Sequence, residues 1–419
     1  MKTNTKPPRA ASSVSELRRA VLSCLLWEDQ FYESGIAIAD RIKALAATAH
    51  PQEVARLAVE ARHEHGLRHV PLLLLCCLAE RRKLTKELVF LCMQRADEPG
   101  ELLALWWKDG RRPIPNAMRK GIAMALCASF DEYQLAKYAN AGGIKLRDVL
   151  FLIRPKPTSP EQAELFRKLA NKELSPPDTW EAALAAGKDK KETFERLLTE
   201  GKIGYMALLR NLRNMSNADV DHSLVAKAIV ARRGSKNVMP FRYVAAAKAC
   251  PRYSAEIDTA LRLTVQEQPI LAGRTIVLVD VSGSMRERLS AKSDLTRLDA
   301  AAALASVVNC EDLRVFTFSS RLVEVSTLRG LGGIKEVVDS QPHANTNLDA
   351  AMAEINEIPH DRLIVITDEQ TDGPVRAPVA ENSYLINVAS YEKCLDRKDG
   401  WTRISGFSEG VLRFIQESE

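Results

Sequence analysis

Residues 275–285, TIVLVDVSGSM, constrain the fold of this chain more than any other segment. The first five are apolar or β-branched, which is typical of a buried strand, and the run stops at Asp280, Ser282 and Ser284. A carboxylate and two hydroxyls at this spacing in a loop can surround a small hard cation such as Mg²⁺, which prefers oxygen ligands. One loop does not fill such a coordination sphere, so we expect further ligands along the chain. The alternative is a capped turn without a metal, because Ser and Asp also favour turns and helix N-caps.

Two later segments carry oxygen-bearing side chains where a strand or loop meets a helix. Thr346 precedes a helix-like stretch in HANTNLDAAM, and Asp368 follows the apolar strand of RLIVITDEQTDG. The same half of the chain alternates further strands with helices: strands at 313–320 and 383–390, helices at 295–309, 334–340 and 348–358. This alternation predicts a doubly wound α/β domain, which we place at residues 269–419.

With three such loops in this order, the segment resembles a von Willebrand factor A-type domain with a metal-ion-dependent adhesion site. The resemblance implies an open, Rossmann-like, mainly parallel sheet with helices on both faces and a metal at the carboxyl ends of the strands. The expected metal is Mg²⁺, with Mn²⁺ as the alternative. The implied metal-binding residues are Asp280, Ser282, Ser284, Thr346 and Asp368.

The chain before residue 269 has almost no strand-like run and is a different kind of domain. Its apolar spacing predicts a series of amphipathic helices: 14–26, 35–47, 51–64, 70–81, 85–95, 99–107, 115–129, 131–139, 146–153, 161–171, 179–185, 190–199, 204–215, 220–231, 241–250 and 253–263. Helix pairs recur about every 40 residues, the period of HEAT-like repeats. We therefore predict a multi-domain chain: a disordered arm at 1–13, an α-helical repeat domain at 14–268, and then the α/β domain.

Charge separates the two halves. Residues 270–419 carry 16 Lys and Arg against 23 Asp and Glu, a net charge of −7, so residues 1–269 carry +12 of the chain's total of +5. A basic helical surface indicates a phosphate-bearing partner; the alternative, solvated charge on exposed helix faces, explains single cations but less easily the imbalance in sign. No apolar run reaches the length of about 18 residues that suggests a membrane span, and the basic N-terminus lacks the apolar core of a secretory signal. The eight cysteines show no zinc-binding spacing, so we expect reduced thiols and a cytoplasmic protein.

Four basic segments of the helical half carry a second resemblance: PNAMRKGIA (115–123), FDEYQLAKYANAGGIKLRDVLFLIRPKP (130–157), ALLRNLRNM (207–215) and PFRYVAAAKAC (240–250). With these segments the chain closely resembles the TROVE-module proteins, the Ro RNA-binding autoantigen family and its bacterial relatives, in which helical repeats also precede an A-type domain. The resemblance implies repeats that close into a ring. It implies small Y RNAs on a basic outer surface and single-stranded 3′ ends of misfolded or structured RNA in the central hole. Bacterial members act in RNA quality control, and some tether an exoribonuclease.

The candidate RNA-binding residues are the cations of these and neighbouring segments: Lys120, Lys137, Lys145, Arg147, Arg154, Lys156, Arg210, Arg213, Arg232 and Arg233. By the resemblance, outer-surface contacts fall between Lys137 and Arg154. Lys137 keeps a basic residue of the family's patch, whereas Arg154 stands where vertebrate members carry His and Ala141 replaces a basic position. The cations after residue 231 are equally explained as a solvated helix C-terminus. We interpret Asn211 and Asn214 as structural amides that bind inter-helix loops.

Nothing in the sequence predicts catalysis. His63, His65 and His69 lack the H-E-x-x-H spacing, and no nucleophile–base pair or phosphate-cradling glycine loop is present. Asp280 and Asp368 are fewer carboxylates than two-metal nucleases use. We therefore expect an RNA-binding protein that is not an enzyme, with no membrane partner and no DNA specificity. The alternatives are a metal-dependent protein-interaction adaptor and a metal-dependent nuclease.

Overall fold

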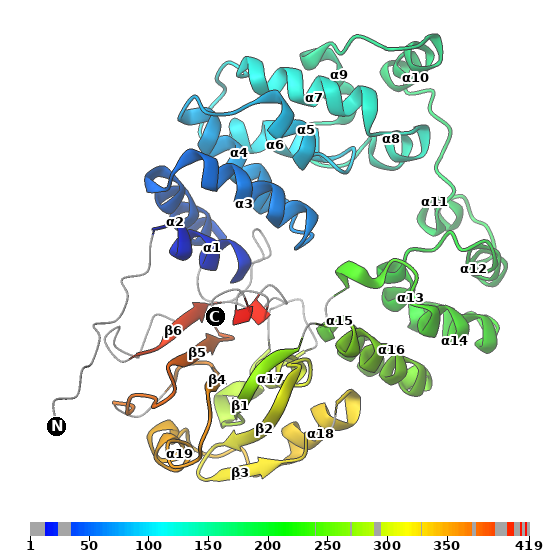
Figure 1. Cartoon of the computed structure of the whole chain (residues 1–419). Coiled ribbons are helices and arrows are strands. Elements are labelled where there is room, and N and C mark those ends of the chain that lie inside the picture. The colour runs from blue at the N-terminus through cyan, green and yellow to red at the C-terminus, as the bar shows by residue number, and fades with distance from the viewer. Residues whose placement is uncertain are drawn as a thin grey trace. The chain divides into compact units, whose positions relative to one another are not determined.

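The computed structural model describes residues 13–23, 35–238, 240–268, 270–288, 295–327, 329–370, 374–389, 400–405, 411–412 and 415–416. The chain divides into two compact units (Figure 1). The first unit contains residues 11–21 and 39–188, and the second contains residues 189–419 with the remaining N-terminal residues. Most of the predicted N-terminal arm lies outside the described residues, and Ser13 already begins the first helix.

The first unit is helical throughout its described residues. Its helices are α1 (Ser13–Ser23, the last two residues of which fall outside the unit), α2 (Gly35–Thr48, which enters the unit at Ala39), α3 (Pro51–His63), α4 (His69–Glu80), α5 (Lys86–Cys92), α6 (Glu98–Trp106), α7 (Asn116–Ala128), α8 (Glu132–Tyr138), α9 (Leu146–Ile153), α10 (Pro160–Asn171) and α11 (Trp180–Ala185). Several begin at side-chain caps, because the oxygens of Thr85, Asp131 and Ser159 accept from backbone amides of the first turn. Each of these helices corresponds to one predicted from apolar spacing, although α5 ends at Cys92 and not at residue 95.

Successive helices of this unit stack on one another. Helix α3 packs on α4 and α5, α5 packs on α7, α4 packs on α6, and both α6 and α7 contact α9. Helix α4 is buried from Val70 to Ala79, as its uniformly apolar sequence requires. Arg81 joins two helix ends, since its Nη1 donates to the carbonyls of Ala46 (2.6 Å) and Ala49 (2.7 Å) at the end of α2. These neighbour relations are those of stacked helix pairs, as predicted.

The described residues of the second unit form eight further helices, five before the sheet and three within the α/β layer. The helices are α12 (Lys190–Thr199), α13 (Tyr205–Asn217), α14 (His222–Ala231), α15 (Pro240–Ala249), α16 (Ser254–Gln266), α17 (Arg297–Ala305), α18 (Leu331–Asp339) and α19 (Leu348–Ile355). Helix α13 packs on α14 and α15, while α15 contacts α17 and α16 contacts α18. The last helices before the sheet therefore pack on helices of the α/β layer. As a result, the boundary between the two compact units comes earlier in the chain than the change from helices to strands.

The sheet has six strands in the order β3-β2-β1-β4-β5-β6 (Figure 1). They are β1 (Leu271–Asp280), β2 (Cys310–Phe318), β3 (Leu322–Val325), β4 (Arg362–Thr367), β5 (Asn382–Asn387) and β6 (Thr402–Ser405). All neighbours are parallel except β2 and β3, which form an antiparallel pair. The predicted doubly wound α/β domain is thus confirmed. The predictions did not include the four-residue strands β3 and β6, which lie at the two edges of the sheet.

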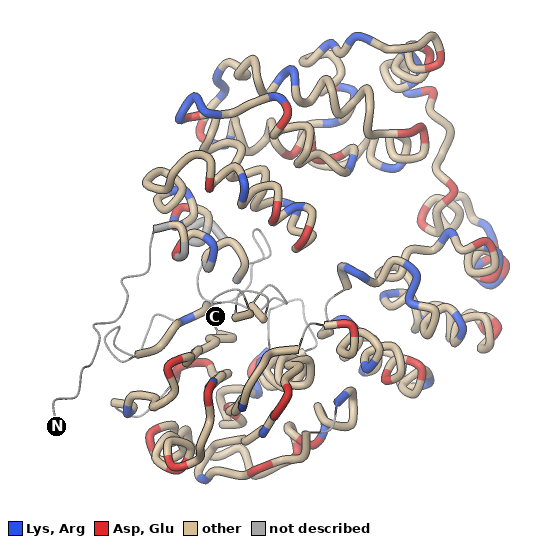
Figure 2. The backbone as a smooth tube through the Cα atoms, viewed as in Figure 1, with Lys and Arg blue, Asp and Glu red and all other residues tan. Residues whose placement is uncertain are grey.

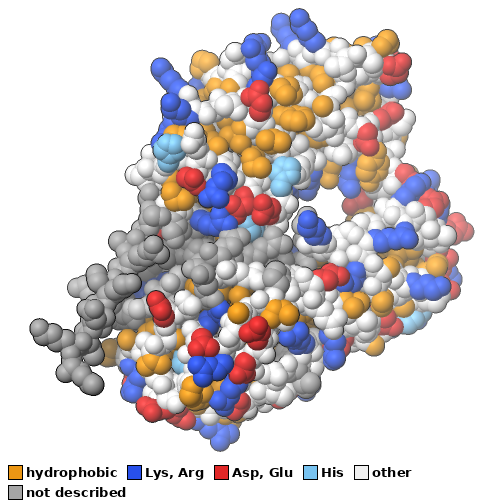
Figure 3. Space-filling view, viewed as in Figure 1, with side chains coloured by type: hydrophobic (Ala, Val, Ile, Leu, Met, Phe, Trp, Pro, Cys, Tyr) orange, Lys and Arg blue, Asp and Glu red, His pale blue; other side chains and the backbone are white. Residues whose placement is uncertain are grey.

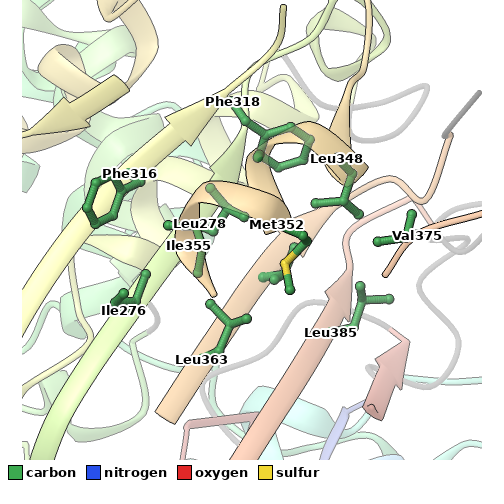
Figure 4. Packing of buried hydrophobic residues seen from close by; sticks show 12 residues of the cluster. Ile276, Leu278, Phe316, Phe318, Leu348, Met352, Ile355, Leu363, Val375 and Leu385 are labelled. Atoms are coloured by element: carbon green, nitrogen blue, oxygen red, sulfur yellow. The ribbon is translucent and has the colours of Figure 1, made fainter. Parts of the chain in front are cut away.

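One hydrophobic core of this layer lies between the sheet and α19 (Figure 4). Ile276 and Leu278 of β1 and Leu363 of β4 point to the same face as Met352 and Ile355 of α19. Helix α17 contacts β1 and β4 instead, and its residues from Arg297 to Ala305 are all buried. The central strand is therefore covered by helices and other chain segments on both sides, which explains why six consecutive residues of β1 are buried.

The described cysteines are unbridged, and most are buried. Burial raises the pKa of the Cys77 thiol to about 11, which keeps it protonated at neutral pH. Cys24 and Cys394 lie outside the described residues. Within the described part of the chain, no helix combines the length and apolar character needed to cross a membrane.

Candidate functional site

The carboxyl ends of β1 and β4 bring two acidic side chains together. Asp280 is the last residue of β1, Asp368 directly follows β4, and both side chains are fully buried. The chain leaves β1 for β2 on one side and reaches β4 on the other, so this edge is the switch point of the sheet. Open α/β sheets bind their ligands at such a point.

Asp280 is held by hydrogen bonds to both of its oxygens. Its Oδ1 accepts from the backbone amide of Ser282 at 2.9 Å, and its Oδ2 accepts from the Thr367 hydroxyl at 2.6 Å. Burial raises the pKa of this carboxyl to about 6, and the neighbouring Asp368 adds to the rise, although both hydrogen-bonding partners oppose it. A nearby positive charge therefore stabilises the ionised form of such a buried carboxyl.

The two serine hydroxyls lie beside a second loop. The Oγ atoms of Ser282 and Ser284 are 3.3 Å apart, and Gly283 donates its backbone amide to the carbonyl of Ala344 at 3.1 Å. His343 Nδ1 lies 2.6 Å from the carbonyl of Val281. The structure therefore places the 343–347 loop, which contains the half-buried Thr346, against the Asp-x-Ser-x-Ser loop.

Asp368 contacts an arginine that the sequence analysis did not identify. Arg297 is the first residue of α17, is 1% exposed, and donates from Nη1 to Asp368 Oδ2 at 3.2 Å. The same nitrogen lies 3.4 Å from the Ser284 carbonyl, and Nη2 donates to Glu287 at 2.5 Å. The signal in the sequence was a cation at the start of an alanine-rich apolar helix.

The donor set fits a hard divalent cation, because hydroxyls and carboxylates are the ligands that Mg²⁺ and Mn²⁺ prefer. The end of β1 and the residue after β4 contribute the carboxylates, the loop after β1 contributes two hydroxyls, and the loop before α19 contributes Thr346. The Arg297 guanidinium offsets one of the two buried negative charges. The ligand atoms of this site are thus suited to a metal ion, but the Arg297 guanidinium already places one positive charge beside them.

The histidine-rich segment of the first unit forms a different kind of cluster. Glu60, Glu64 and His65 approach one another closely enough for their ligand atoms to share an ion. However, Arg18 donates to both oxygens of Glu60, at 2.8 and 2.6 Å, and His65 Nε2 lies 3.0 Å from Glu60 Oε1. Burial raises the pKa of Glu60, but these hydrogen bonds and charges outweigh it and lower the pKa. The contacts are those of a structural ion pair that ties α1 to α3.

The candidate RNA-binding cations of the first unit are all exposed, and two of them lie against aromatic rings. Lys137 Nζ is 5.4 Å from the ring centre of Tyr133 on α8, and the Arg147 guanidinium is 5.5 Å from that of Phe151 on α9. The two aromatic residues are 42% and 54% exposed, respectively. Each pair is spaced four residues apart, which places its members on one helix face. The candidate residues predicted from the sequence include both cations but neither aromatic residue.

The other cations of this group have varied surroundings. Lys145 donates to the carbonyls of Asn140 and Gly142, both at 2.7 Å, so its ammonium is turned back onto its own loop. Arg154 ends α9 in the left-handed conformation with φ of 52°. Lys120 is exposed on α7, and Lys156 is exposed in the segment that follows α9.

In the second unit, the predicted cations lie on α13 and after α14. Arg210 and Arg213 are exposed, and Arg213 donates to the Ala249 carbonyl at 3.0 Å. Arg232 forms a double hydrogen bond to Glu267, and its side chain is only 10% exposed, whereas Arg233 is exposed.

The two asparagines of α13 have structural contacts, but not the predicted ones. Asn211 donates to the Ala207 carbonyl at 2.9 Å, and Asn214 donates to the Asn211 side chain at 3.0 Å. These amides therefore bond within α13 instead of to inter-helix loops.

A further basic edge of the first unit was not predicted. The loops that join α4 to α5 and α6 to α7 are rich in Lys and Arg (Figure 2). Exposed Arg82, Lys83 and Arg111 lie in these loops, and the Arg111 guanidinium is 5.0 Å from the Trp107 ring centre. Figure 3 shows basic side chains at this edge and hydrophobic side chains gathered over the neighbouring helices.

Two comparisons with known proteins agree with this architecture. Residues 168–250 match the family model of the TROVE domain. Among solved structures, the chain is similar to the crystal structure of the Deinococcus radiodurans RO (RSR) protein, with a TM-score of 0.66 and 16% sequence identity over 97% of this chain and 100% of that chain. The structural match shows that the helices and the α/β layer together form a known fold. With the TROVE match, it supports the predicted resemblance to bacterial Ro-type TROVE proteins.

Proposed function

We propose that this protein binds RNA through the helical repeats. The observation that carries the proposal is the pair of exposed aromatic residues, Tyr133 and Phe151, each with a cation over its ring on consecutive helices. Proteins hold unpaired nucleotides by stacking bases on aromatic rings and neutralising phosphates with nearby cations. The TROVE match and the net charge of the helical half support the same function.

We further propose the RNA partners that the family resemblance implies. They are a small Y-type RNA held by the outer basic surface, and misfolded or structured RNA whose single-stranded 3′ end enters the hole of a helical ring. The role would be RNA quality control in the cytoplasm, with an exoribonuclease as a further partner. Backbone contacts to a folded stem need cations at spaced positions, which Lys120, Lys137, Arg147 and Lys156 provide.

The metal site has a separate part in the proposal. Asp280, Ser282, Ser284, Thr346 and Asp368 would hold Mg²⁺ or Mn²⁺, and the bound ion would supply a positive charge that accepts an acidic side chain of a protein partner. The second function that we propose is therefore that of a protein-interaction adaptor, which the α/β layer would provide. It is compatible with RNA binding by the repeats. We assign no catalysis, because Asp280 and Asp368 are only two carboxylates and Arg297 binds one of them.

A salt titration with charge-reversed variants tests RNA binding. We expect Lys137→Glu with Arg147→Glu to weaken binding of a labelled stem-loop with a single-stranded tail by about tenfold or more, and to make its salt dependence shallower. Fluorescence anisotropy at increasing KCl measures both quantities.

The matched control is Arg321→Glu with Lys335→Glu, which changes the net charge equally on exposed positions of the α/β layer. Equal losses in the two double variants would show that total charge decides binding and not the α8–α9 surface. No binding of wild-type protein at low salt would contradict the proposal altogether.

A further inference from the structure

We propose that Arg297 is a built-in counter-ion of the candidate metal site and lowers the affinity of that site for divalent cations. This inference rests on the proposed metal site. It concerns a residue outside the donor set: Arg297 offers no ligand atom to a metal, yet its Nη1 contacts both Asp368 Oδ2 (3.2 Å) and the carbonyl of Ser284 (3.4 Å).

Burial makes this contact energetically important. Asp280 and Asp368 are both 0% exposed, and an ionised carboxylate in such surroundings is unfavourable unless a positive charge or several hydrogen bonds compensate it. Asp280 has two hydrogen-bond donors, Ser282 and Thr367, but both are neutral. Among the described residues of this site, the guanidinium of Arg297 carries the one positive charge within hydrogen-bonding distance of either carboxylate.

The position of Arg297 in its helix also calls for such a partner. It is the first residue of α17, and the positive end of a helix dipole disfavours a cation there. Helix α17 is nevertheless fixed at this point, because Thr296 and Asp299 form a capping box and Lys248 of α15 bonds to Asp299 at 2.6 Å. The backbone amide of Arg297 donates to the Glu287 carbonyl at 2.9 Å. The arginine is thus held at an unfavourable helix position, with its Nη1 directed to Asp368 and its Nη2 to the more exposed Glu287.

Two consequences follow for metal binding. A divalent cation at these ligands is repelled by the neighbouring guanidinium, because charges within a few ångströms of each other interact strongly in a buried site. Without a metal, the same guanidinium stabilises Asp368, so the layer keeps its structure. Arg297 therefore reduces the difference in stability between the metal-bound and the metal-free protein.

The test compares metal affinities of full-length variants. Isothermal titration with MnCl₂ alone is run on wild type, Arg297→Gln, Arg297→Lys and the control Arg274→Gln, which removes an exposed arginine paired with Asp361 at the opposite end of β1. We expect Arg297→Gln to bind Mn²⁺ at least about tenfold more tightly than wild type. Arg297→Lys keeps the charge and should stay closer to wild type, and the control should not change.

Thermal unfolding with and without Mn²⁺ gives an independent readout for a less stable variant. Arg297→Gln should unfold at a lower temperature than wild type without metal and gain more from added Mn²⁺. Equal or weaker Mn²⁺ affinity in Arg297→Gln would overturn the inference while leaving the metal site intact. If neither protein binds Mn²⁺, or if Asp280→Ala binds it as well as wild type, the proposed metal site itself is wrong.

Discussion

At the scale of single residues, the ion pair between Asp349 and Arg376 contributes to the response of the α/β layer to acid. Asp349, near the start of α19, accepts from the Arg376 guanidinium at 2.9 and 2.8 Å and from its backbone amide at 2.8 Å. The side-chain hydrogen bonds and the amide lower the pKa of this carboxyl from 3.8 to about 2. A depressed carboxyl pKa stabilises the fold above the unfolded-state value, and this contribution is lost as pH falls through the folded-state value.

We therefore expect Asp349→Asn to reduce the acid sensitivity of the layer. Wild-type protein should lose stability between about pH 4 and pH 2 partly through this carboxyl, and the variant should show a shallower loss over that window. Urea unfolding at several pH values measures the change. Asp339→Asn, which removes an exposed partner of Lys335 within α18, is the control. An identical pH profile for Asp349→Asn and wild type would contradict the assignment.

At the scale of elements, α19 closes one face of the sheet and should determine the stability of the layer. Met352 is fully buried against Leu278 and Leu363 (Figure 4). Met352→Ala should destabilise the layer by about 2 to 5 kcal/mol, because the cavity adds to the lost apolar burial. Urea unfolding followed by circular dichroism measures it, with the exposed Glu354→Ala as control. A loss below about 1 kcal/mol would show that this face is not the core.

The helices and strands differ in how well the sequence predicts them. Helix α9 was predicted with both its ends, because its apolar spacing is strong and Pro155 prevents its continuation. Helix α5 was predicted to reach residue 95 but ends at Cys92, where Met93 becomes extended without any local sequence signal. Strands β3 and β6 have four residues each and β3 is only partly buried, so even the apolar residues of β3 form too short a pattern to identify a strand. They are strands because a neighbouring strand offers hydrogen bonds, which is a tertiary effect.

The candidate metal site could likewise be predicted only in part from the sequence. Asp280, Ser282 and Ser284 follow one strand at fixed spacing, so a local pattern identifies them. Arg297 and Asp368 are 71 residues apart, and only the fold brings them together. The aromatic partners of Lys137 and Arg147 were missed because an aromatic residue on a helix usually belongs to the core. Their exposure is visible only in the structure.

At the scale of the whole molecule, the chain combines a basic series of helices with an acidic α/β layer. The contact between α15 and α17 and the Lys248–Asp299 pair join the last repeats to the helix that begins at Arg297. In this account the repeats hold RNA, while the α/β layer offers a metal-dependent contact to protein. We expect mutations to separate the two proposed functions, because the residues proposed for each lie on different elements.

Sequencing the RNA that co-purifies with the protein after ultraviolet crosslinking tests directly whether the helical repeats bind RNA. Wild-type protein should carry small structured non-coding RNAs with single-stranded ends, and recovery should fall strongly in the Lys137→Glu, Arg147→Glu variant. Asp280→Ala, which changes only the metal site, should retain the RNA. Recovery of no RNA above the background of an unrelated protein, or an undiminished yield from the double variant, would contradict RNA binding at this surface.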